Sequence, residues 1–89
     1  MTTKTLYHAT NESAANSIDY QGFRRGGGGR QGSAVYLSET PSEARRRSRN
    51  GNSVVYAVKV KLYSSGYGYD GESYAIYDTN QIRNYYRCD

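Results

Sequence analysis

The sequence predicts a small α+β domain with mostly antiparallel strands and two short helices. The chain has 89 residues, enough for one domain that buries only about 60% of the surface its unfolded chain exposes. Residues 53–62 alternate between apolar and polar side chains, which is typical of a half-buried strand. Two other segments carry helix-capping residues. No internal repeat or domain boundary appears, so we expect a single domain over residues 1–89.

Residues 4–8 predict the first strand, because β-favouring side chains follow one another there without helical spacing. A helix should follow almost at once. Thr10 or Asn11 can cap its first turn, and Glu12 suits the positive end of its dipole. Gly22 supplies the stop signal.

Residues 24–33 consist largely of glycine and arginine, a composition that predicts a loop without regular structure. Residues 34–37 then predict a second strand. The glycines and their flanking arginines could close over a phosphate-bearing ligand as a lid, or they could form an ordinary surface loop.

The second helix has the strongest start signal in the chain. Thr40 is a capping residue, Pro41 suits the first helical position, and Glu43 stands at the capping-box position. We expect this helix to run to about Asn50-Gly51. It has almost no apolar face and should lie on the surface.

The C-terminal half predicts strands separated by one glycine- and tyrosine-rich loop. The alternation over residues 53–62 places one face of that strand on the core. Residues 64–71 predict the loop, and residues 73–77 and 81–86 predict the closing strands.

The composition favours an anionic ligand. Lys and Arg number 12 against 8 Asp and Glu, and guanidinium groups match phosphate oxygens, whether of a nucleotide or of a nucleic acid. The chain has one cysteine, Cys88, so it forms no internal disulfide, and we expect a reducing compartment. No secretion signal or membrane-spanning run is visible. We expect a monomer in the cytoplasm or nucleus with no membrane partner.

His8 and Tyr36 are the leading candidate site residues. Each lies in a short apolar run and is followed by a small hydroxyl residue, Thr10 or Ser38. Such a pair can line one crevice and hold a planar, hydroxyl-bearing ligand. Taken alone, His8 could instead be a strand histidine satisfied by a neighbouring carbonyl, and Tyr36 could be core filler.

Several segments, taken in order, resemble the ADP-ribosyltransferase fold of the poly(ADP-ribose) polymerase group. In that family a His-Gly-Thr/Ser strand, a short helix ending in Gly-Phe or Gly-Leu, and a Gly-x-Tyr strand flank the NAD pocket. The resemblance covers nearly the entire chain and makes it a minimal member with a split β-sheet. The matching segments are residues 7–10, residues 14–23, residues 32–44 and residues 74–82.

The resemblance implies that NAD is the co-substrate. We expect no metal, because Cys88 and His8 lack partner ligands for a metal site. The resemblance also implies that His8 bonds the adenosine-side ribose and that the backbone of Ala9, where the family has glycine, holds the nicotinamide carboxamide. Tyr36 would stack on nicotinamide and Ser38 would assist the carboxamide, with Thr10 beside them. Arg30, in the glycine-rich loop, would meet the pyrophosphate.

The family's catalytic glutamate falls on Ser73, and Glu72 lies one position earlier. Because side chains alternate along a strand, this offset points Glu72 away from the pocket unless a bulge re-aims it. Glu72 is still the nearest acid for stabilising charge at the ribose, and its alternative role is that of a solvated acid. A second departure is Arg47, where polymerases often carry a stacking tyrosine.

Three functions remain open on this evidence. The first is an NAD-dependent mono-ADP-ribosyltransferase that acts on a protein or nucleic-acid acceptor, with His8, Tyr36 and Glu72 as its catalytic residues. The second is a domain that binds NAD or ADP-ribose without turnover. The third is a small RNA-binding module in which tyrosines stack on bases and arginines neutralise phosphates.

Overall fold

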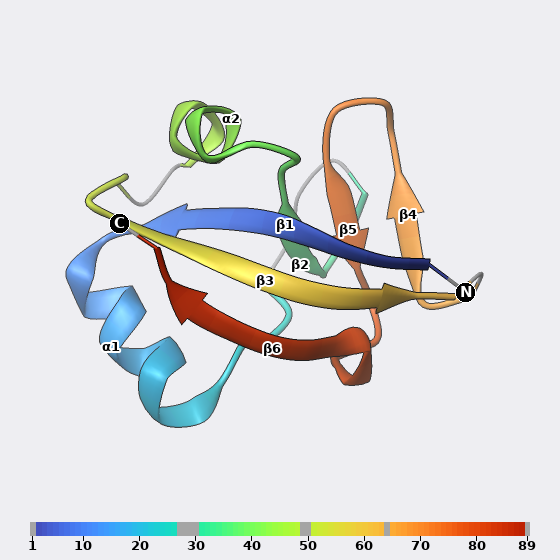
Figure 1. The fold of residues 1–89 in the computed structure, drawn as a ribbon, viewed down its shortest axis with the longest axis horizontal. Helices are drawn as coiled ribbons and strands as arrows, with labels where there is room; N and C mark the ends of the chain where they lie inside the picture. The colour runs from blue at the N-terminus through green and yellow to red at the C-terminus, as the bar shows by residue number, and fades with distance from the viewer. Residues whose placement is uncertain (1, 27–30, 49–50, 64, 89) are drawn as a thin grey trace.

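The computed structural model describes residues 2–26, 31–48, 51–63 and 65–88. The described strands form two antiparallel sheets of three strands each, in the orders β1-β3-β6 and β2-β5-β4 (Figure 1). With two helices beside them, this is the α+β architecture that the sequence predicts. In chain order the elements are β1 (Thr2–Thr10), α1 (Glu12–Gln21), β2 (Val35–Leu37), α2 (Pro41–Arg47), β3 (Val54–Leu62), β4 (Tyr67–Tyr69), β5 (Tyr74–Ile76), the 3₁₀ helix η1 (Thr79–Gln81) and β6 (Ile82–Arg87).

The first sheet is built on β3, its central and most buried strand. β1 pairs with β3 over its full length, from Thr2 opposite Leu62 to Thr10 opposite Val54. β6 covers the other edge of β3. The main hydrophobic core lies on one face of this sheet, and its largest fully buried side chains include Leu6 and Tyr56.

The second sheet is short and is tied to the first through β1. Tyr7 and Ser38 form an isolated antiparallel bridge, in which each backbone N–H donates to the other residue's carbonyl at 2.8 Å. In Figure 1, β2 and β5 lie behind β1, and α2 lies above it. The bridge holds β2 against the middle of β1.

The strand over residues 54–62 is more buried than its alternation predicts. Val55 lies on the face away from the main core, yet it is fully buried in a second cluster with Ala9 and with Ala44 of α2. The predicted core face is confirmed, because Val54, Tyr56, Val58, Val60 and Leu62 all lie in the main core, and the first half of β3 is covered on its second face as well. α2 covers the opposite face there with one small side chain.

Both helices begin where their caps predict. The side chain of Asn11 accepts from the backbone N–H of Ala14, and α1 ends at Gly22, whose φ of 80° suits glycine. Thr40 caps α2, with Pro41 in its first turn. The predicted end of α2 at residues 50–51 was wrong.

α2 stops at Arg47 because Ser48 adopts an extended conformation, φ −69° and ψ 130°. The hydroxyl of Ser48 then donates to the carbonyl of Gly51, which has a φ of 92°. Side-chain bonding of serine to nearby backbone competes with helix continuation, and here it closes a turn.

The predicted loop over residues 64–71 contains a strand. Tyr67–Tyr69 pairs with β5 as β4, with Tyr67 opposite Ile76 and Tyr69 opposite Tyr74. The ring of Tyr69 stacks on that of Tyr74 at 4.3 Å between centroids. Within the part of the chain that the structure describes, no helix has the length and apolar character needed to cross a membrane.

Candidate functional site

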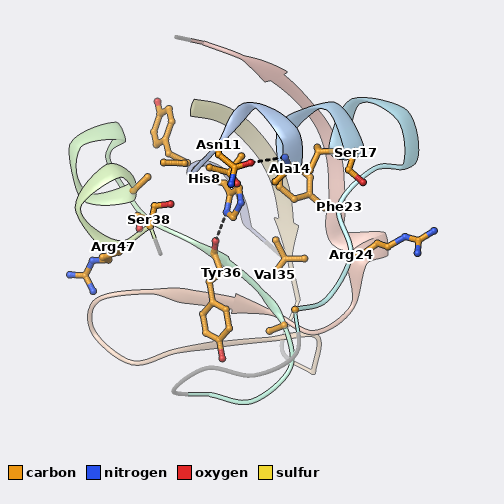
Figure 2. Close-up of a pocket in the computed structure, with 18 of the residues that line it drawn as sticks. His8, Asn11, Ala14, Ser17, Phe23, Arg24, Val35, Tyr36, Ser38 and Arg47 are labelled. Carbon is orange, nitrogen blue, oxygen red and sulfur yellow. Dashed lines mark hydrogen bonds between the residues drawn. The ribbon is translucent and has the colours of Figure 1, made fainter. Parts of the chain in front are cut away.

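A cavity of about 820 Å³ lies where the two sheets and both helices meet. Its lining comes from the end of β1, one face of α1, β2 and the last turn of α2 (Figure 2). The turn between β4 and β5 completes it. The volume is within the range of about 300–1,000 Å³ that is usual for small-molecule sites.

The cavity brings together most of the predicted site residues. His8, Ala9, Thr10, Tyr36 and Ser38 all lie on its lining. They come from two strands that the Tyr7–Ser38 bridge fixes side by side.

Among the predicted residues that the structure describes, one does not join this group. Glu72 is not among the residues that line the cavity, whereas Ser73 is. Arg30 and the glycines before it, residues 27–30, lie outside the described residues.

His8 is held by the backbone of β2. Its Nδ1 lies 3.1 Å from the carbonyl oxygen of Tyr36, and because a carbonyl can only accept, Nδ1 carries the proton. The imidazole also meets Phe23 edge to face at 5.4 Å between ring centroids. Burial lowers the pKa of His8, and the bond to the Tyr36 carbonyl opposes this shift. The neutral ring therefore keeps an unprotonated Nε2, which bonds to no residue that the structure describes.

The backbone of Ala9 faces the cavity side of β1. The carbonyl of Val55, which lies opposite Ala9, accepts from Cys88 on the far edge of β3 at 2.9 Å. Val55 and Ala9 are therefore a non-hydrogen-bonded pair, and the N–H and C=O of Ala9 point away from β3. Two residues earlier, Tyr7 directs its own N–H and C=O to that same edge, toward Ser38. Among the described residues, none hydrogen-bonds to the Ala9 backbone on this edge.

Tyr36 reaches the cavity from β2 without touching the imidazole. Its hydroxyl donates to the carbonyl of Gly32 and accepts from the N–H of Gln31, so the ring is fixed at its tip. Figure 2 shows its phenol extending away from His8 on the far side of the Tyr36 carbonyl. The two rings thus line one cavity at separate points.

The acidic residues near the site, Asp70 and Glu72, lie in the turn between β4 and β5. The carboxylate of Asp70 accepts from the backbone N–H groups of Glu72 and Ser73, at 2.9 and 2.8 Å, and Asp70 itself lies on the cavity lining. Glu72 instead pairs with Arg47, whose Nη1 is 3.2 Å from its carboxylate. Sequence reasoning missed Asp70, although the pair Asp70-Gly71 is a recognisable turn signal.

The described residues contain no group of three or more His, Cys, Asp or Glu side chains that could hold a metal ion. The chain matches no family model, no curated protein and no solved structure, so its function must be argued from the site.

Proposed function

We propose that this domain is an NAD-dependent mono-ADP-ribosyltransferase that binds NAD in the cavity, releases nicotinamide and passes one ADP-ribose to a protein or nucleic-acid acceptor. The observation that supports the proposal is the backbone of Ala9 on the cavity edge of β1, which hydrogen-bonds to none of the described residues there. A primary carboxamide carries an NH2 donor group and a carbonyl acceptor on the same carbon, so one N–H and the C=O can bond side by side to a single partner. The C=O and N–H of a single extended residue such as Ala9 can accept from and donate to these two carboxamide groups at the same time.

The residues around Ala9 suit the rest of the ligand. The unprotonated Nε2 of His8 can accept a hydrogen bond from a ribose hydroxyl. The phenol of Tyr36 is locked by its two hydroxyl bonds, so its ring face is available without loss of side-chain freedom. Ser38 is buried directly after β2 and would add a hydroxyl beside the carboxamide.

Cleavage of the nicotinamide–ribose bond develops positive charge on the ribose, which nearby carboxylates and carbonyls stabilise. Asp70 is on the cavity lining, while Glu72 is held by Arg47. Chain elongation needs a carboxylate that activates an acceptor hydroxyl, and Ser73 occupies the position where the resembled polymerases have it. This arrangement favours transfer of single units.

A second candidate function is binding of NAD or ADP-ribose without turnover. The observation that favours it is the same substitution: a serine, not a glutamate, lies on the cavity lining ahead of β5. In that case the Ala9 backbone and His8 would still bind the ligand.

The test is incubation with NAD labelled in its adenosine half, together with measurement of free nicotinamide. We expect label on an acceptor and release of nicotinamide, both lost in His8→Ala. Calorimetric binding of NAD with no release would select the second function. Folded protein that binds no NAD, or salt-sensitive RNA binding that His8→Ala leaves intact, would reject both.

A further inference from the structure

Arg47 is the cation that the fold brings to this cavity from α2. It is the last residue of the helix, its side chain is 27% exposed, and it lies on the cavity lining. Its Nη1 contacts the carboxylate of Glu72 at 3.2 Å and the hydroxyl of Ser73 at 3.5 Å. The guanidinium thus reaches from the last turn of α2 to the turn before β5, and Figure 2 shows it at the outer side of the cavity, pointing away from His8 and Tyr36.

The Arg47 guanidinium is incompletely satisfied in this arrangement. Its Nε is buried and has no hydrogen-bond partner among the described residues. Its Nη2 reaches Glu43 of the same helix only at 3.9 Å. A buried N–H without an acceptor is costly, so a second arrangement that pairs Nε gains stability as soon as a ligand supplies the oxygen.

The Glu72 carboxylate, which contacts the Arg47 guanidinium, can be displaced from it by another anion. Its side chain is 52% exposed, and solvent-exposed ion pairs contribute little because water and salt screen them. Glu72 also follows Gly71, whose φ of 91° marks a turn rather than a strand. The pyrophosphate of a dinucleotide carries two negative charges against the one of a carboxylate, and its oxygens match the guanidinium fork with two parallel bonds.

We infer that Arg47 is a phosphate-binding residue of this cavity and that Glu72 occupies it in the absence of ligand, so that a bound phosphate group displaces the carboxylate. The inference rests on the proposed function for the source of that phosphate, the pyrophosphate of NAD. Ligand binding then frees Glu72 from its ion pair. Without a bound phosphate, the ion pair with Arg47 keeps Glu72 out of the cavity.

The experiment is calorimetric titration at fixed ionic strength with two ligands, inorganic pyrophosphate and ADP-ribose. Glu72→Gln removes the competing charge and should tighten binding about two- to five-fold, the range expected for loss of a screened ion pair. Glu39→Gln is the matched control, since it removes the same charge from a carboxylate that pairs with Lys4 instead. We expect no tightening in this control. Arg47→Gln should weaken binding about ten-fold or more.

Equal tightening by both glutamate variants would overturn the inference, because it would reflect net charge alone. An unchanged affinity in Glu72→Gln, or in Arg47→Gln with a native circular dichroism spectrum, would overturn it as well. Pyrophosphate contains neither nicotinamide nor ribose, so the titration with pyrophosphate tests the Arg47 site even if the protein does not turn over NAD. The expected pattern with pyrophosphate but not with ADP-ribose would support the phosphate site and reject NAD as its source.

Discussion

The two sides of the cavity are held in place by different means. The ladder wall, formed by His8 and Ala9 of β1 with Tyr36 of β2 and Ser38 directly after it, is fixed by backbone hydrogen bonds between neighbouring strands. The ion-pair wall, formed by Arg47 and Ser73 on the cavity lining with Glu72 paired to Arg47 behind them, is fixed by partly exposed side chains. Backbone contacts between strands cannot exchange partners without unfolding, whereas a screened ion pair can. We therefore expect the first wall to be rigid and the second to respond to ligand.

The largest expected effect tests the rigidity of the ladder wall. Leu6 is fully buried on β1, so Leu6→Ala should lower the free energy of unfolding by about 2–5 kcal/mol, through lost burial and the cavity left behind. Urea unfolding followed by circular dichroism measures the change. Such a loss is a large fraction of the stability of a domain this small.

Thr5→Ala is the matched control, because Thr5 is the exposed neighbour of Leu6 on the same strand. It should change the unfolding free energy by less than about 1 kcal/mol. Equal losses of unfolding free energy in Leu6→Ala and Thr5→Ala would contradict the burial of Leu6 in the core.

The second expected effect concerns the pH dependence of the same wall. Burial lowers the pKa of His8 from its ordinary value of 6.5, so between that value and the folded pKa the unfolded chain binds more protons than the folded one. Stability should therefore fall as the pH is lowered from 7 to 5. His8 is the one histidine of the chain, so His8→Gln should flatten this part of the curve. Parallel curves for the two proteins in urea unfolding would show that the imidazole is not buried as a neutral ring.

The smallest expected effect belongs to the ion-pair wall. Glu72→Gln should change the unfolding free energy by less than about 1 kcal/mol, because its pair with Arg47 is half exposed. The same urea experiment checks it, with Glu39→Gln as a comparison of equal charge. A loss as large as that of Leu6→Ala would remove the distinction between the two walls.

The elements that sequence reasoning predicted correctly depend on local chemistry. Asn11 and Gly22 bound α1, and Thr40 and Pro41 start α2, because capping involves residues close together in the chain. Glu72, which the resemblance offered as a catalytic residue, is absent from the cavity lining. It lies in the turn before β5 and not in a strand, so the alternation of side chains along a strand does not explain its position.

The features that sequence reasoning missed depend on distant contacts. β4 contains a glycine between two tyrosines and becomes a strand by pairing with β5. Asp70 reaches the cavity because that hairpin places its turn there, and a polar Asp-Gly pair looks like any exposed turn. The orientation of the Ala9 backbone follows from the register of β1 on β3, which the sequence does not reveal.

The most direct test of the account is an amide NMR titration with nicotinamide. The Ala9 backbone N–H is predicted to point into the cavity without a partner, so its resonance should move downfield on binding as it donates to the carboxamide. The amide of Val55, which faces the opposite edge of β3, is the internal reference. A selective shift at Ala9 is the predicted result. An unmoved Ala9 resonance in folded protein, at nicotinamide concentrations that saturate any other shift, would contradict the central claim.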